Sequence, residues 1–265
     1  MLPPESKLEV VSRTPARDTS RAPLLFVHGG YCDAWCWTPY FLPYFARNGY
    51  AAHALSLRGH GASGGRDSLF LASLDDYAAD VAHVAATLPA APVVIGHSMG
   101  AAVVERLLAT RPLRAAALLA PIPPSGFGPI LRRLAMQQPE YLARLHQFDP
   151  RAQMDILDAL RPMYFSDAVE PRILTQIMRH LTDESPRALF DLTLRLHAAP
   201  PIDAARPFVL GAEDDRVCSP LDVHATAKLY DVEATILPGL AHMMMLEMEW
   251  RRAADAVLAW LEGVA

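Results

Sequence analysis

Several residue types are scarce in this sequence, and each shortage argues against a class of protein. Only three cysteines occur, Cys32, Cys36 and Cys218. An odd number without a paired framework argues against a disulfide-stabilised secreted domain and fits a reducing compartment. Cys32 and Cys36 have no second pair of ligands at matching spacing, so a zinc site is disfavoured. We expect neither a metal nor an organic cofactor.

Positive charge and long apolar runs are also sparse. The formal net charge is −5, lysine occurs only at Lys7 and Lys228, and no basic block exists. Nucleic acid and anionic membranes are therefore poor candidate partners. No apolar run reaches the roughly 18 residues of a membrane span. The N-terminal segment 1–13 has no cationic stretch followed by an apolar one, so we expect no secretory signal and a cytoplasmic location.

What the chain does contain is enough apolar material for a large core. Hydrophobic residues make up 52% of its 265 residues. This length suits one large domain, or a domain that carries an inserted cap. Such a composition argues against an intrinsically disordered chain.

Short apolar runs alternate with helical patterns through the first half of the chain. We expect strands at 24–27, 51–57, 92–95 and 113–119. Helices are expected at 38–48, 73–88 and 99–110, the second of them with Ser73 as N-cap and Asp76 three residues on. Uninterrupted apolar runs suit strands that are covered on both faces. The order of elements therefore predicts an α/β fold with a doubly wound, mostly parallel sheet.

The pattern changes after Pro121. Residues 122–201 show helical periodicity interrupted by prolines, with helices expected near 129–147, 151–160, 170–181 and 186–197. Strands are expected again at 207–211 and 234–237, followed by a final amphipathic helix at 247–261. The predicted organisation is a core of residues 1–121 and 202–265 that carries a helical cap of residues 122–201.

The most specific motif is G-x-S-x-G, which occurs as Gly96-His97-Ser98-Met99-Gly100. It lies between an expected buried strand and an expected helix. A sharp strand-to-helix turn strains the serine backbone and leaves room only for small neighbours at Gly96 and Gly100. The turn also places the serine oxygen at a helix N-terminus, where developing negative charge is stabilised. Ser98 is therefore predicted to be a catalytic nucleophile.

A second segment, His28-Gly29-Gly30, follows an earlier strand. A tetrahedral intermediate needs two hydrogen-bond donors directed at its negatively charged oxygen, which together are called the oxyanion hole. The backbone N–H of Met99, the residue after the nucleophile, is one expected donor. We expect the second to be the N–H of Gly30.

The other members of a triad should follow in the chain order Ser, acid, His. Among the ten histidines, His242 alone lies late in the chain on a loop after a strand. The acid is expected in the segment that follows the preceding strand, where Asp214 and Asp215 are both candidates. Asp215 is preferred, since the D-x-V motif that it begins lets the chain turn back into the structure after the carboxylate. Asp214 remains the alternative.

The segments HGGYCDAWCW, LRGHGAS, GHSMGA, GAEDDRV and PGLAHMMMLE occur in the order and spacing of the α/β-hydrolases. The chain resembles their bacterial esterase and lysophospholipase-like group, from about Leu24 to Leu261, and only weakly across the predicted cap. The HGGYCDAWCW segment is also similar to plant methylesterases and hydroxynitrile lyases. The resemblance implies the α/β-hydrolase fold, a catalytic triad of Ser98, Asp215 and His242, and oxyanion donors at Gly30 and Met99.

Two positions depart from the patterns that these relatives show. Many members carry aspartate in the turn where this chain has Ser56-Leu57-Arg58, which leaves the triad untouched. The related lyases carry lysine directly after the catalytic histidine, and this chain has Met243 there. A cyanohydrin lyase is disfavoured, because the cyanide leaving group would lack its cation.

The predicted function is hydrolysis of a carboxylic ester, a small molecule of small to medium size, uncharged and hydrophobic. Adaptable apolar side chains would line its pocket, and we expect these at Trp37, Phe127, Leu131, Met163 and Met243. The same triad could serve a thioesterase, a lactonase or a carbon–carbon bond hydrolase. A non-catalytic receptor of the same fold is the alternative from another class, and it would have no need of all three triad residues.

Overall fold

The computed structural model describes residues 7–17, 19–137, 139, 161–194 and 205–264. Within these residues, seven strands form one sheet in the order β1-β3-β2-β4-β5-β6-β7. The six strands from β2 to β7 run parallel to one another. The short β1 (Glu9–Arg13) lies at one edge and pairs antiparallel with β3 (Ala52–Ser56). The prediction of an α/β fold with a mostly parallel sheet is confirmed.

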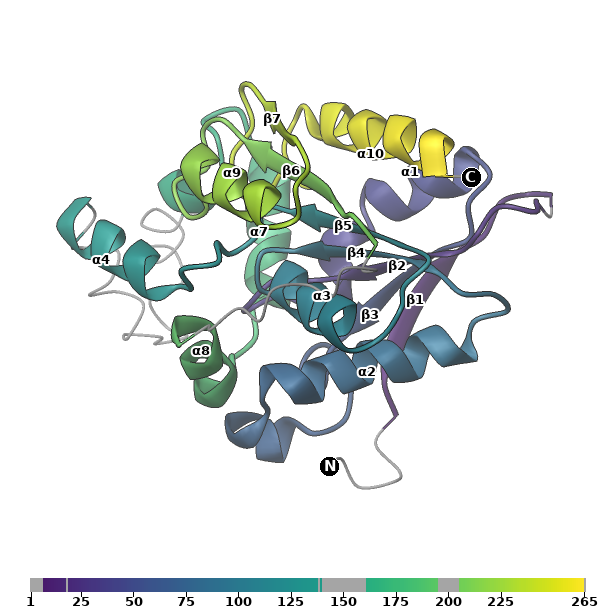
Figure 1. The fold of residues 1–265 in the computed structure, drawn as a ribbon, viewed down its shortest axis with the longest axis horizontal. Coiled ribbons are helices and arrows are strands. Elements are labelled where there is room, and N and C mark those ends of the chain that lie inside the picture. Colours follow the sequence, from purple (N-terminus) through teal and green to yellow (C-terminus); the bar gives the residue numbers. More distant parts are fainter. Residues whose placement is uncertain (1–6, 18, 138, 140–160, 195–204, 265) are drawn as a thin grey trace.

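Helices cover both faces of this sheet (Figure 1). On one face lie α1 (Phe41–Arg47) and α10 (Trp250–Val264), which contact each other. On the other lie α2 (Leu74–Thr87) and α3 (Met99–Thr110). Because both faces are covered, the central strands β2 (Leu24–Val27), β4 (Val93–His97) and β5 (Ala115–Leu119) are buried at every position, as their uninterrupted apolar runs predict.

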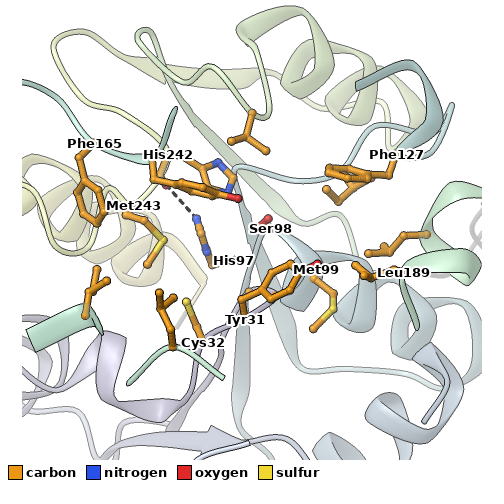
Figure 2. A pocket seen from close by; sticks show the side chains of 18 of the residues that line it. Tyr31, Cys32, His97, Ser98, Met99, Phe127, Phe165, Leu189, His242 and Met243 are labelled. Carbon is orange, nitrogen blue, oxygen red and sulfur yellow. Dashed lines mark hydrogen bonds between the residues drawn. The ribbon is translucent and has the colours of Figure 1, made fainter. Parts of the chain in front are cut away.

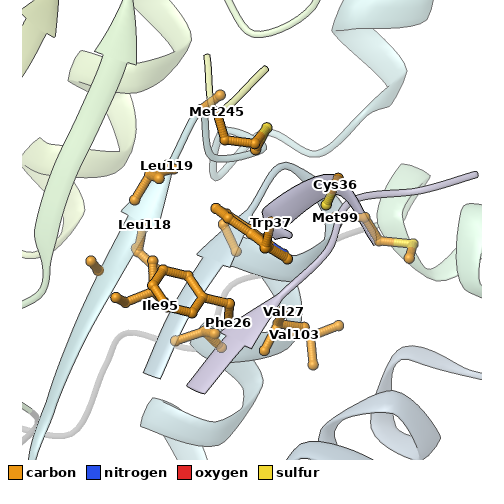
Figure 3. Packing of buried hydrophobic residues seen from close by; sticks show 14 of the residues in the cluster. Phe26, Val27, Cys36, Trp37, Ile95, Met99, Val103, Leu118, Leu119 and Met245 are labelled. Atoms are coloured by element: carbon orange, nitrogen blue, oxygen red, sulfur yellow. The ribbon is translucent and has the colours of Figure 1, made fainter. Parts of the chain in front are cut away.

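The core below the candidate site is built on these central strands (Figure 3). Phe26 of β2 packs against Trp37, with ring centroids 4.9 Å apart, and both side chains are fully buried. Ile95 of β4 and Leu118 of β5 are fully buried in the same cluster. Close packing here gives rigid support to the loops that follow these strands.

Several element boundaries follow directly from local signals. Ser73 caps α2 through a reciprocal pair of hydrogen bonds with Asp76, as predicted. The helix expected at 38–48 corresponds to α1, and a 3-10 helix that was not predicted, η1 (Ala34–Trp37), precedes it. The last helix begins at Trp250 instead of Glu247. The 3-10 helix η2 (Arg66–Leu71) was not predicted.

The C-terminal part of the sheet holds β6 (Phe208–Ala212) and β7 (Ala234–Leu237), both near their predicted positions. Between them lies α9 (Pro220–Leu229), which contacts both strands and was not predicted. In the described part of the chain, no helix has the length and apolar character needed to cross a membrane.

Between β5 and β6, the structure describes α4 (Gly128–Gln137), α7 (Pro171–His180) and α8 (Pro186–Thr193). They agree with three of the four helices expected there. The fourth, at 151–160, lies outside the described residues. In Figure 1, α4 and α8 lie beyond the left end of the sheet. That residues 122–201 form a separate cap remains a prediction.

Candidate active site

The backbone of Ser98 is strained at the turn from β4 into α3. Its φ and ψ angles are 53° and −118°, a conformation that residues with a side chain rarely adopt. A Cβ atom on Gly96 would lie 2.3 Å from the carbonyl oxygen of Gly100, and one on Gly100 would lie 2.4 Å from that of His28. Only glycine therefore fits on either side. The turn holds Ser98 at the N-terminus of α3, as the G-x-S-x-G motif predicts.

His242 and Asp215 form a buried pair on the loops after β7 and β6. The His242 Nδ1 lies 2.8 Å from the Asp215 Oδ2, and the two residues are only 2% and 4% exposed. The other carboxylate oxygen, Oδ1, accepts hydrogen bonds from the backbone N–H groups of Val217 and Cys218, each at 2.8 Å. The Asp215 Oδ2 can only accept, so it favours the His242 tautomer that carries its proton on Nδ1. The His242 Nε2 is then able to accept a proton.

Asp214, the alternative acid, is placed differently. Its residue is exposed, whereas Asp215 is buried. Its backbone N–H donates to the carbonyl oxygen of Leu240 at 3.0 Å. The structure thus brings His242 together with Asp215 and leaves the Asp214 carboxylate at the surface.

His97 links the nucleophile strand to the His242 loop. Its Nε2 donates to the backbone carbonyl oxygen of His242 at 2.9 Å, the dashed line in Figure 2. The two imidazole rings have their centroids 4.7 Å apart. Burial, and then the neighbouring His242, lower the pKa of His97 well below its usual range. His97 is therefore a neutral side chain that holds the His242 backbone next to Ser98.

The loop after β2 packs directly on the nucleophile. A Cβ on Gly29 would lie 3.1 Å from the Cβ of Ser98. Within the described residues, the backbone N–H groups of Gly30 and Met99 donate to no protein acceptor. Both residues line the same cavity as Ser98. Two free donors near a serine oxygen are what an oxyanion hole requires.

His28 supports this loop from inside. Its Nδ1 donates to the carbonyl oxygen of Gly29 at 2.8 Å, and its Nε2 accepts from the N–H of Leu57 at 3.0 Å. Burial, and then the neighbouring His60, lower the pKa of His28 to about 3. A neutral ring satisfies both contacts, so the local geometry of the loop depends on an uncharged His28.

The two neutral histidines should make the fold sensitive to mild acid. Unfolded His28 and His97 would gain protons near pH 6.5, while their folded pKa values are lowered. Below that pH the unfolded state binds more protons, so their stabilisation is present above about pH 6.5 and is lost as pH falls. We expect the free energy of unfolding to fall between about pH 6.5 and 5, by up to about 1.4 kcal/mol per pH unit for each histidine.

Urea unfolding at half-unit pH steps would measure this effect. Most carboxylates titrate below about pH 5, so the histidines dominate this interval. Burial raises the pKa of Glu247, whose titration acts in the opposite direction. A free energy of unfolding that stays constant from about pH 6.5 to 5 would contradict the assignment of neutral, buried rings.

Ser98 and His242 line a cavity of about 300 Å³ at the carboxyl ends of the strands (Figure 2). Its lining is mainly apolar, from Met99, Ile122, Phe127, Leu131, Phe165, Leu174, Ile177, Leu181, Leu189, Leu192, Val217 and Met243. Among the described lining residues, Arg161 alone carries a permanent charge. Parallel sheets place ligands at this end, where the loops from several strands converge.

The cavity differs from the predicted one at two positions. Phe127, Leu131 and Met243 line it, whereas Trp37 and Met163 do not. Trp37 is fully buried in the core, against Phe26 and Phe41. Met163 is 1% exposed and lies in a helical turn from which Arg161 and Tyr164 line the cavity. Both side chains are apolar, but their neighbours place them away from the site.

Tyr164 is a lining residue that the five predicted pocket residues do not include. Its ring meets the His242 imidazole at a centroid distance of 5.6 Å, and its backbone carbonyl accepts from the N–H of Met243 at 2.9 Å. It lies one residue from the predicted Met163. Helical periodicity alone could not decide which of these neighbours faces the cavity.

Only one group of residues in the described part of the chain could hold a metal ion. The ligand atoms of Asp215, Cys218 and His242 all lie within 4.8 Å of one another. The carboxylate and imidazole are already hydrogen-bonded to each other, and Asp215 also accepts two backbone N–H bonds. A catalytic acid–base pair accounts for this cluster. Cys32 and Cys36 form no such group.

Comparison with known proteins agrees with this geometry. Residues 24–257 match the profile described as "Alpha/beta hydrolase family". No curated protein matches the chain. The structure is similar to a thermophilic esterase from Thermogutta terrifontis, with a TM-score of 0.74, 20% identity, and 100% of this chain and 96% of that chain covered.

Two further solved structures show the same fold. A monoacylglycerol lipase from Paleococcus ferrophilus has a TM-score of 0.70 at 18% identity, with 98% and 100% of the two chains covered. An enol-lactonase from Burkholderia xenovorans has a TM-score of 0.71 at 17% identity, with 97% of each chain covered. At such low sequence identities, the structural similarity shows the fold alone. The similarity of the N-terminal segment to plant methylesterases and hydroxynitrile lyases stays a prediction.

The family profile spans the strands from β2 to β7, the Ser98 turn and the His242 loop. The sheet order, the strained turn after β4 and the similar solved structures point the same way. The chain belongs to the alpha/beta hydrolase family.

Proposed function

We propose that the protein is a serine hydrolase that cleaves carboxylic esters through Ser98, His242 and Asp215. The observation that carries this proposal is the strained Ser98 on the wall of the cavity that His242 also lines, with His242 held by a buried carboxylate at 2.8 Å. A glycine-rich turn that only caps a helix would need neither the buried pair nor the cavity.

In the first step, the Ser98 Oγ forms a bond to the carbonyl carbon of the ester. The Ser98 proton passes to the His242 Nε2, and the carbonyl π electrons move onto the oxygen. The N–H groups of Gly30 and Met99 would stabilise this oxyanion. Asp215 holds the imidazole in orientation and stabilises its charged form.

In the second step, the tetrahedral intermediate collapses and its bond to the alcohol oxygen breaks. The proton on His242 goes to that oxygen, and the acyl group stays on Ser98. Water then attacks the acyl carbon and gives its proton to His242. A second collapse breaks the bond to the Ser98 Oγ, which takes the proton back, and the acid is released.

The cavity supports an uncharged, moderately hydrophobic substrate. Phe127, Leu131 and Met243 line it together with other apolar side chains. Burying each additional CH2 group of an acyl chain against such a wall contributes about 0.8 kcal/mol. A volume of about 300 Å³ limits how far this gain can continue.

Hydrolysis of p-nitrophenyl acetate, butyrate and octanoate tests the proposal. We expect kcat/KM to rise about tenfold from acetate to butyrate, because two more CH2 groups are buried, and to gain no further at octanoate. The mono-p-nitrophenyl ester of succinic acid, with a charged acyl end, is the control. A strong preference for the charged ester would contradict an uncharged substrate, and hydrolysis of none of them would contradict the esterase.

The same panel, with competitors added, separates other reactions of this triad. A thioester or a lactone that outcompetes the best p-nitrophenyl ester would move the assignment to that class. The residues and steps proposed above would stay the same, because each reaction begins with attack of Ser98 on a carbonyl carbon.

A further inference from the structure

A buried carboxylate that the mechanism above does not use lies beside the oxyanion loop. Glu184 lies between α7 and α8, and its side chain has no exposed surface. Its Oε1 accepts from the Tyr77 hydroxyl and the Ser185 N–H, each at 2.7 Å. Its Oε2 lies 3.2 Å from the Tyr31 N–H nitrogen and 3.2 Å from the His60 Nε2. Burying a charge is unfavourable unless it is paired and hydrogen-bonded, and here four donors surround it.

His60 is the cation of this group. Its Nδ1 lies 2.9 Å from the carbonyl oxygen of Arg58, which can only accept, so Nδ1 carries a hydrogen. Its Nε2 faces the Glu184 carboxylate and must carry a second one. Burial is the largest single effect and opposes this charge, but the hydrogen bond to Glu184, the Glu184 charge and the bond to the Arg58 carbonyl together raise the pKa of His60. Burial is likewise the largest effect opposing the Glu184 charge, but the bond from His60, its charge, and the bonds from Tyr77 and Ser185 together lower the pKa of Glu184.

The segment that carries Glu184 holds the backbone of Tyr31 from both sides. The Tyr31 N–H donates to Glu184, and the Tyr31 carbonyl oxygen accepts from the N–H of Thr182 at 3.1 Å. Tyr31 has a φ of 61°, which is unfavourable for a residue with a side chain unless its surroundings impose it. The first bond fixes the peptide that joins Gly30 to Tyr31, and the second fixes the peptide that follows Tyr31.

Gly30 lies close to the same carboxylate. A Cβ on Gly30 would lie 3.6 Å from the Glu184 Oε2. An isolated negative charge at this place would repel an oxyanion bound to the Gly30 N–H. The His60 imidazolium balances that charge, so the pair can hold the loop and remain neutral as a whole.

We infer that Glu184 is a positioning residue. It holds the Gly30–Tyr31 peptide and thereby orients Gly30, so that the Gly30 N–H, which belongs to the preceding peptide, points at the oxyanion. The inference rests on the proposed function and extends it, because it makes the oxyanion hole depend on the segment between α7 and α8. Docking of that segment on the sheet domain then completes the catalytic site.

Glu184→Gln tests the inference with little change of shape. The amide replaces one acceptor oxygen with a donor, so at least one of the four hydrogen bonds must be lost. We expect kcat for p-nitrophenyl butyrate, per active site titrated with a fluorophosphonate, to fall about 10- to 100-fold. KM should change less than about threefold, because the interaction is made mainly in the transition state.

Phenylboronic acid supplies a readout that a merely structural role would not move. Its boron takes the Ser98 oxygen as a fourth ligand, and the adduct presents an oxygen to the oxyanion hole. We expect its inhibition constant to rise in Glu184→Gln by about the same factor as kcat falls. Thermal unfolding would show which variants are folded.

His180→Gln is the matched control. His180 is the last residue of α7, directly before this segment, and its Nδ1 lies 3.0 Å from the Asp33 carboxylate of the same loop. No hydrogen bond that the structure describes joins it to the Gly30–Tyr31 peptide. The kcat of His180→Gln should stay within about threefold of wild type. Tyr77→Phe is the second test variant if Glu184→Gln does not fold. It removes one donor to Glu184 and keeps both charges, and we expect kcat to fall about 3- to 10-fold, with the boronic acid following.

The outcomes distinguish failure of the Glu184 positioning role from failure of the proposed function. Wild-type turnover combined with an unchanged kcat and inhibition constant in folded Glu184→Gln would overturn the positioning role alone. An unchanged Tyr77→Phe would do the same if Glu184→Gln does not fold. An equal loss in His180→Gln would overturn it too, since general docking of the segment would then suffice. Absence of turnover in the wild type would overturn the proposed function, and the inference with it.

Discussion

Ser98→Ala is expected to lower kcat for p-nitrophenyl ester hydrolysis by about 10⁴- to 10⁶-fold. The alanine removes the only atom that forms the acyl bond, while the strained turn, the cavity and the buried His242–Asp215 pair remain. Residual activity should come only from the oxyanion donors and from binding of the ester. Steady-state rates of both proteins, measured with p-nitrophenyl butyrate, give the ratio directly.

The fold of the variant is easy to control. Ser98 makes no side-chain cap hydrogen bond to α3, so its loss should leave the thermal unfolding midpoint within a few degrees of wild type. Comparable weak rates in the two proteins would mean that Ser98 does not act on esters. A non-catalytic receptor of the same fold would then become the better description.

Asp215→Asn is expected to lower kcat by about 10⁴-fold. Asparagine can still accept the N–H bonds of Val217 and Cys218 through one oxygen. Its NH2 group, however, would then face the His242 Nδ1. The imidazole would have to accept there and carry its proton on Nε2, where it can no longer take the proton of Ser98.

Asp214→Asn is the matched control, because it is the same substitution one residue away. The Asp214 residue is exposed, whereas Asp215 is buried. We expect kcat within about twofold of wild type. A large loss in Asp214→Asn with near-normal activity in Asp215→Asn would exchange the two roles, and comparable losses in both would argue against a single acid.

The predicted triad and the predicted oxyanion donor Gly30 all follow strands of a parallel sheet. Gly30 follows β2, Ser98 follows β4, and Asp215 and His242 follow β6 and β7. The carboxyl ends of parallel strands meet at one end of the sheet. Gly30, Ser98 and His242, spread over more than two hundred positions, therefore line one cavity once the strands are correctly placed, and Asp215 is hydrogen-bonded to His242.

Elements without a buried apolar run escaped prediction. The edge strand β1 alternates between half-buried and exposed residues, so it lacks the continuous pattern that marks β2 and β4. The α9 helix has little apolar periodicity, although a signal was present: Pro220 in its first turn and a capping box of Ser219 and Asp222. That box could have located the helix.

The direction in which a side chain points was the other feature that could not be predicted from the sequence. Trp37 and Met163 have the apolar character of pocket residues, yet their surroundings place them in the core. Glu184 lies in the polar stretch Thr182-Asp183-Glu184-Ser185, which suggests a solvated loop. Its burial arises from tertiary contacts with Tyr31, His60 and Tyr77, which no local pattern records.

The most direct test of the central claim is to find the covalent bond on Ser98. A fluorophosphonate is incubated with the wild type and with Ser98→Ala, and the labelled peptide is located by mass spectrometry. We predict one label per wild-type chain, on the peptide that holds Gly96-His97-Ser98-Met99-Gly100, and none on that peptide in the variant. A label on another residue, or an unlabelled wild type that still hydrolyses esters, would contradict the account of Ser98 as the nucleophile.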